Sequence, residues 1–182
     1  MANIDSPNGF RPFQQILQLN KYYTTNNSCI GQGHPVGVTA SGTVRAATFT
    51  GVGGGGAGKG TLAGVAVNFV SSSGSNARRE VYVYDHPLQR FSVQATAAIA
   101  QTAFYLNYNV TRIQGGAGSA TCNRTTGQSK LKLSATTSNT TFGFFHVLGW
   151  ANVVESVTTA ANNRVFGIIN RKYLKATSTL GI

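Results

Sequence analysis

Charged residues are scarce in this 182-residue sequence, and acidic residues are the scarcest. The four acids, Asp5, Glu80, Asp85 and Glu155, stand against 15 lysines and arginines, so the formal net charge is +11. Four scattered carboxylates disfavour a carboxylate metal cage and a paired general acid and base. Charged residues make up 10% of the chain, where about 25% is usual, so Ser, Thr, Asn and Gln must supply the polar surface.

Cysteines and long apolar runs are also rare. Cys29 and Cys122 are far apart in the sequence and fit no metal-ligand spacing. We prefer to interpret them as two buried free thiols, with one disulfide as the alternative. No run of about 18 apolar residues occurs, so we expect no membrane partner.

Motifs that would indicate catalysis or a cofactor are missing. The glycine-rich segment 51–60 and Thr61 resemble a phosphate-binding loop, but Gly60 occupies the place where Ser or Thr must follow the lysine. Neither a nucleophile elbow nor a local Cys-His signature accompanies His34, His86 and His146. We therefore predict a protein that is not an enzyme and has no cofactor, and we interpret segment 51–60 as a loop.

Short β-patterned segments dominate the chain from about residue 30. Segment 80–85 places Tyr82 and Tyr84 on one face and valines on the other, and segment 130–134 alternates Leu inward with Lys outward. Further strands are expected at 37–44 around a turn, 61–70, 91–95, 142–150 and 165–170. Segment 96–104 is the one helix candidate, with Thr96 as a possible N-cap. The pattern predicts an all-β fold, a single jelly-roll-like β-barrel or β-sandwich with at most one short helix.

The first 20 residues differ from the rest and are expected to form an extended arm, with the β domain covering 21–182. Pro7 and Pro12 favour extended backbone. Phe10 and Phe13 give the arm apolar groups to bury, either on its own domain or on a neighbouring subunit. We predict that Phe10, Arg11, Pro12 and Phe13 contact another protein.

The excess of positive charge needs a partner or an explanation. Its tight clusters are Arg78 with Arg79, Lys130 with Lys132, and Arg171 with Lys172. Three interpretations stay open: docking on an acidic protein surface, strand edges protected against aggregation, and nucleic-acid binding with Tyr82 and Tyr84 as stacking platforms. We favour the first and predict Arg78, Arg79, Lys130 and Lys132 as charge contacts, because the charge is scattered rather than gathered beside aromatics.

Short motifs along nearly the whole chain resemble the head decoration, or capsid cement, proteins of tailed bacteriophages. VYVYDHP at 81–87, followed by FSVQ at 91–94, is the closest match and is similar to the central hairpin of that family. His34, in GHPV at 33–36, stands where the family usually has an acid. The other matching segments are 1–3, 7–12, 62–65, 127–133, 147–149 and 163–170.

The resemblance implies a structural virion protein on the outer surface of the capsid, made in the host cytoplasm. It would clamp neighbouring subunits of the major capsid protein, with the arm lying across one of them. We expect a homotrimer at a three-fold position of the capsid, and a dimer at a two-fold position is the second choice. The alternatives are a basic nucleic-acid-binding module and another virion component such as a head-fibre or tail protein.

Overall fold

The computed structural model describes residues 8–24, 29–47, 62–71, 78–112, 125–139, 143–151 and 160–170. Within these ranges the chain forms β-strands and a single short 3-10 helix, η1 (Gln101–Ala103). The strands are β1 (Arg11–Pro12), β2 (Asn20–Tyr23), β3 (Cys29–Ile30), β4 (Pro35–Val38), β5 (Val44–Ala46), β6 (Leu62–Ala66), β7 (Val70–Ser71), β8 (Glu80–Tyr84), β9 (Arg90–Gln94), β10 (Asn107–Arg112), β11 (Leu131–Asn139), β12 (Phe145–Trp150) and β13 (Arg164–Ile169).

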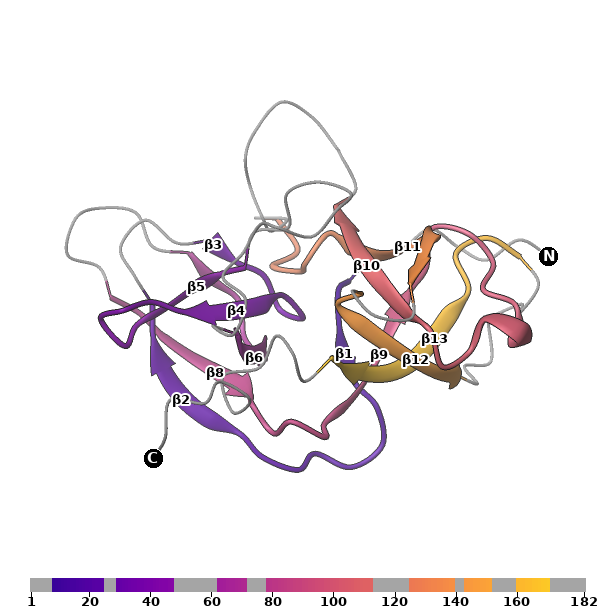
Figure 1. Ribbon diagram of the computed structural model, residues 1–182. Coiled ribbons are helices and arrows are strands. Elements are labelled where there is room, and N and C mark those ends of the chain that lie inside the picture. The colour runs from indigo at the N-terminus through magenta and orange to yellow at the C-terminus, as the bar shows by residue number, and fades with distance from the viewer. Residues whose placement is uncertain are drawn as a thin grey trace.

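The strands form two large sheets that lie side by side (Figure 1). The five-stranded sheet has the order β2-β8-β6-β4-β5, and the six-stranded sheet has the order β1-β9-β13-β12-β10-β11. β3 and β7 form a separate two-stranded pair. All strand pairs are antiparallel. The predicted all-β fold is confirmed.

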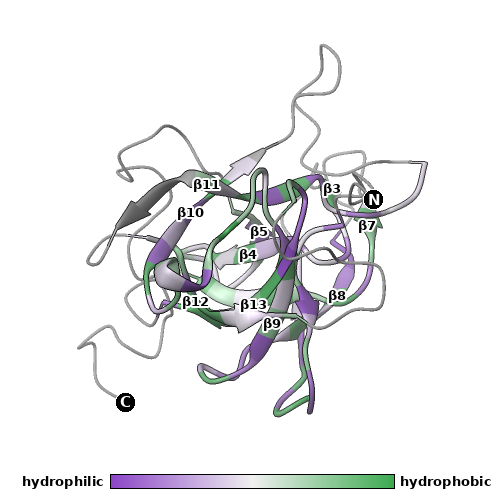
Figure 2. Ribbon diagram, turned by 90° about the vertical axis from the view of Figure 1, so that its right-hand side faces the viewer, coloured by the Kyte–Doolittle hydropathy of each residue, from purple (hydrophilic) through white to green (hydrophobic). Residues whose placement is uncertain are grey.

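Both large sheets curl until strands at or next to their opposite edges approach each other. Parallel bridges join Thr24 to Val44 in the five-stranded sheet and Ala95 to Leu133 in the six-stranded sheet. Figure 2 shows the curl of the six-stranded sheet, with β9, β13, β12, β10 and β11 arranged in an arc. Curling of this kind gives barrel-like sheets whose inner side chains fill the core.

The curled sheets enclose two hydrophobic clusters. The smaller joins the five-stranded sheet to the β3-β7 pair and includes Val36, Val81 and Val83 with Ile30 and Val70. The larger fills the six-stranded sheet and also takes in Leu62 and Val65 from β6, so it continues across the boundary between the sheets. Alternate burial along β8 and β13 follows the two-residue period of a strand, and in β8 this period is also visible in the sequence.

The chain crosses between the two sheets twice, and the two crossings run side by side. β1 pairs with β9 in one sheet, whereas β2 pairs with β8 in the other. We call the segments between these strands, residues 13–19 and 85–89, the connecting segments. Both lie along the lower edge of the molecule in Figure 1.

Three local expectations need correction. The helix expected at 96–104 is reduced to η1, because Ala100 (φ −72°, ψ 156°) and Phe104 (φ −70°, ψ 159°) have extended backbone on either side of it. The strand expected at 61–70 is broken after Ala66.

The preferred interpretation of two free cysteine thiols is also wrong, since Cys29 is disulfide-bonded. The only other cysteine in the sequence is Cys122, which lies outside the described residues. A cross-link of this kind stabilises a fold chiefly by restricting the unfolded chain.

Candidate protein-contact surface

Gln89 fastens the two connecting segments to each other. Its side chain is almost fully buried, and its Oε1 accepts a hydrogen bond from the Leu17 backbone N–H at 2.9 Å. Its Nε2 donates to Gln15 O at 3.1 Å and to Arg90 O at 2.9 Å. A further bond runs from Arg90 Nη1 to Gln14 Oε1 at 2.7 Å. Residues 14–17 thus have a defined position although they belong to no strand.

The connecting segments present apolar side chains to solvent. Ile16 is 52% exposed, Leu19 47%, and Leu17 and Leu88 45% each. We call these four residues the apolar loop surface. Single exposed hydrophobic residues are ordinary, but four on two segments joined by hydrogen bonds indicate a candidate protein-protein contact.

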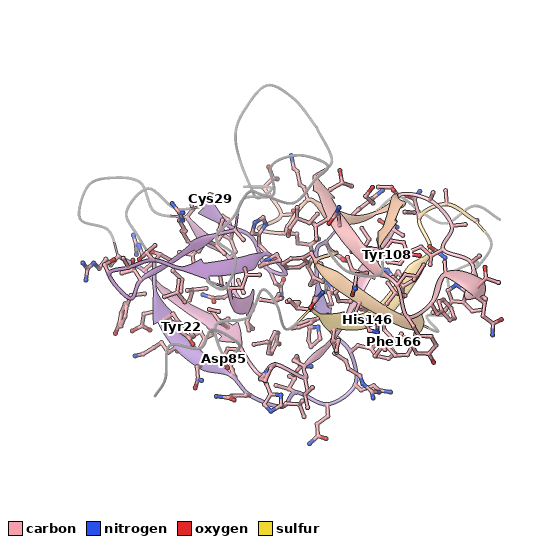
Figure 3. The ribbon with its side chains drawn as sticks, viewed as in Figure 1. Tyr22, Cys29, Asp85, Tyr108, His146 and Phe166 are labelled. Carbon is pink, nitrogen blue, oxygen red and sulfur yellow. The ribbon has the colours of Figure 1, made fainter. Side chains whose placement is uncertain are left out.

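Asp85 anchors the base of this surface. Its Oδ2 accepts hydrogen bonds from Tyr22 OH at 2.8 Å and from Asn20 Nδ2 at 2.7 Å. Figure 3 shows Tyr22 and Asp85 close together beside β2 and β8. Burial, followed by the hydrogen bond to Asp85, raises the pKa of Tyr22 to about 12. The Tyr22 hydroxyl thus donates to Asp85 and holds β2 against the end of β8.

The predicted arm residues pack on their own chain over residues 10–13. Phe10 is only 1% exposed, and its ring contacts those of Phe91, Phe144 and Phe145 at centroid distances of 5.1–6.3 Å. Phe10 therefore belongs to the chain's own core, which corrects its predicted role as an anchor on a neighbouring subunit. Phe13 is half-buried and stacks on Phe166 at 4.7 Å.

Arg11 and Pro12 form β1 and are half-buried. They pair with Ser92 and Phe91 of β9. Part of each residue remains accessible, so the prediction that they contact another protein stays a prediction.

The predicted charge contacts do not lie on one surface. Arg78 and Arg79 are exposed just before β8, and Lys130 is half-buried just before β11. Lys132 was expected to face outward, but it is 3% exposed and its Nζ donates to Asn162 Oδ1 at 2.8 Å. Leu131, Lys132 and Leu133 are all buried, so both faces of β11 are covered at this point.

Two histidines take structural positions. His34 is buried, with Nδ1 3.2 Å from Ser129 Oγ and Nε2 3.1 Å from Ala47 O. His146 is half-buried on β12, and its Nδ1 lies 3.0 Å from Asn107 Oδ1. Because an amide oxygen only accepts, Nδ1 of His146 carries the proton and Nε2 is the atom that titrates. Burial lowers the pKa of His146 below its ordinary value of 6.5.

Replacing His146 with glutamine is expected to weaken the acid sensitivity of the fold. Well above pH 6.5 His146 is neutral in both states and contributes no pH dependence. As the pH falls below 6.5, His146 takes up a proton in the unfolded chain before it does so in the folded chain. The free energy of unfolding therefore decreases until the pH has passed the lower pKa of the folded state. Thermal unfolding at pH 7.5 and 5.5 checks this: His146→Gln should lose less on acidification than the wild type. An equal loss in both proteins would contradict it.

Sequence reasoning missed the apolar loop surface. The signal for it is the segment QILQL at 15–19. Its three branched apolar residues stand among glutamines, but they do not alternate with polar residues as in a half-buried strand. Such a segment has no inner face to bury its apolar residues. Leu88 gives a weaker signal, as an apolar residue in the turn after Pro87.

The described ranges contain no group of three or more His, Cys, Asp or Glu residues that could hold a metal ion. In that part of the chain no helix is long and apolar enough to cross a membrane. A scan against protein-family models found no match, and a search of curated proteins found none either.

Proposed function

We propose that this protein is a structural component of a bacteriophage virion that decorates and stabilises the capsid by binding the major capsid protein. The apolar loop surface is the observation that carries the proposal on the structural side. The resemblance of the sequence to head decoration proteins supports the choice of partner. The protein would act from the outer surface of the shell, and its copies would be related by the capsid symmetry. A trimer is the preferred assembly, and a dimer is the alternative.

The geometry of the connecting segments suits a clamp. A contact surface gains most when its side chains are already ordered before binding, because less conformational freedom is lost. The hydrogen bonds of Gln89 provide that order for residues 15–17 and 89–90. Exposed Arg90 lies beside the apolar residues, and a net charge of +11 favours approach to an acidic shell.

A stabilising protein of this kind works by mass action. It binds the assembled shell and not the separated subunits, so every bound copy raises the free energy needed to remove a subunit. Many moderate contacts repeated by symmetry suffice, and no catalytic group is needed.

Weakening the apolar loop surface should weaken capsid binding. In the double variant Ile16→Ser/Leu88→Ser, one branched side chain is lost from each connecting segment. Burying the exposed halves of both is worth about 2 kcal/mol, so we expect about 30-fold weaker binding. Co-sedimentation with capsids that have been emptied and stripped of this protein measures the change.

A matched control distinguishes capsid binding through the apolar loop surface from nonspecific hydrophobic binding. Tyr105 is 70% exposed, lies next to His146 of β12 and belongs to neither connecting segment, so Tyr105→Ser should bind capsids like the wild type. Both variants should melt within a few degrees of the wild type, as surface substitutions do. Equal binding by the double variant would reject the apolar loop surface. Failure of the wild type to bind capsids at all would reject the virion function.

A further inference from the structure

The outer face of β2 and β8 carries two exposed tyrosines. In the register of these strands Lys21 is opposite Tyr82, and Tyr23 is opposite Glu80. All four are exposed, whereas Val81 and Val83 on the other face are fully buried. We call Lys21, Tyr23, Glu80 and Tyr82 the tyrosine face.

The two rings are close neighbours on this face. Tyr23 and Tyr82 are diagonal partners across an antiparallel pair, a relation that places side chains about 7–8 Å apart. Tyr23 is 46% exposed and Tyr82 is 41% exposed. The backbone of β8 beneath them is held by Asn68, whose Oδ1 accepts from Tyr82 N at 2.8 Å and whose Nδ2 donates to Glu80 O at 3.2 Å.

The one carboxylate on the tyrosine face is already neutralised. Glu80 Oε1 lies 3.2 Å from Lys21 Nζ and accepts a bond from Tyr23 OH at 3.4 Å. The ammonium of Lys21 also lies 5.7 Å from the centroid of the Tyr23 ring. The pair leaves no net negative charge that would repel an anion.

Two further cations adjoin the tyrosine face. Arg78 and Arg79 are exposed and directly precede β8. The backbone of Arg79 is tied to the end of β2, because Arg79 N donates to Thr24 Oγ1 at 3.1 Å and Thr24 N donates to Arg79 O at 2.9 Å. Lys21, Arg78 and Arg79 against Glu80 give this region an excess of positive charge.

We propose that the tyrosine face binds single-stranded nucleic acid. Successive bases would stack on Tyr82 and Tyr23, and the backbone phosphates would contact Arg78 and Arg79. The sequence had suggested Tyr82 and Tyr84 as platforms, but Tyr84 is buried and Tyr23 takes its place. An acidic protein fits less well, since the apolar part of this face is confined to the two rings. The inference does not depend on the capsid proposal, because the connecting segments are not involved.

Fluorescence anisotropy with a labelled 15-nucleotide oligothymidylate at low salt tests the proposal. The wild type should bind this probe more tightly than a double-stranded probe of equal length. Tyr23→Ala/Tyr82→Ala should weaken binding at least about 25-fold, since each stacked base contributes about fivefold or more. Arg78→Gln/Arg79→Gln should reduce the slope of log affinity against log salt by about 1.4, the loss of two phosphate contacts.

Tyr105→Ala is the control, because it removes a tyrosine that is even more exposed than Tyr23 and Tyr82 but lies outside β2 and β8. It should bind like the wild type, and circular dichroism should show that every variant is folded. Tighter binding to the double strand, or wild-type affinity in the tyrosine double variant, would overturn the proposal. So would competition by polyglutamate as strong as that by unlabelled oligonucleotide, which would indicate an acidic protein partner.

Discussion

Phe10→Ala is expected to destabilise the protein by about 3–5 kcal/mol, the usual cost of removing a fully buried phenylalanine. The ring contacts Phe91, Phe144 and Phe145, which come from β9 and from the start of β12. Its loss would leave a cavity where the N-terminal segment meets the six-stranded sheet. Thermal unfolding should show a midpoint lowered by about 10 °C in a chain of this length.

Phe13→Ala is the control for Phe10→Ala. Phe13 is half-buried and stacks on one ring, that of Phe166, so its removal should cost about 1 kcal/mol. Near-equal and small effects of the two substitutions would show that the N-terminal segment detaches easily from the body. That result would support the prediction that the first 20 residues form an arm separate from the β domain.

Gly33→Ala is expected to cost about 2–5 kcal/mol. Gly33 has φ +79°, and a Cβ there would meet Asn8 O at 2.6 Å and Phe10 O at 2.8 Å. Its carbonyl accepts a bond from Phe10 N, and its N–H donates to Ala66 O, both at 2.8 Å. The added methyl group would therefore combine left-handed backbone strain with displacement of the N-terminal segment.

Gly42 is a close control for Gly33. It has nearly the same backbone angle, φ +77°, but a Cβ there would meet nothing within 4 Å. Gly42→Ala should therefore show only the conformational cost of about 1–2 kcal/mol. Chemical denaturation measures both variants, and the difference between them isolates the steric clash. Equal destabilisation of the two variants would show that the residues around Gly33 can move to accommodate the methyl group without a cost in stability.

Local pattern was enough to predict much of the fold. β8 and β9 were expected at nearly their observed bounds, because valine and aromatic residues alternate in a strongly β-favouring segment and Pro87 marks the turn between them. β10 was not anticipated, although Tyr108 and Val110 are buried and alternate with polar residues. The alanine-rich segment before it suggested a helix and obscured that signal.

Long-range packing accounts for what the sequence did not reveal. Lys132 is buried with its ammonium bonded to Asn162, a residue 30 positions away, and no local rule encodes that meeting. Phe10 is buried because its partners come from residues 91, 144 and 145, so an apolar arm and an apolar core strand look alike in the sequence. The apolar loop surface depends on two segments about 70 residues apart that Gln89 joins.

The paired crossing of the chain has a mechanical consequence. A pull on the connecting segments would pass into the β1-β9 ladder on one side and the β2-β8 ladder on the other. The connecting segments are continuous with strands of both ladders, so a force on them would reach the hydrogen bonds of both sheets. A partner seated on the apolar loop surface would thus be fastened to both sheets at once, and the load would be divided between them.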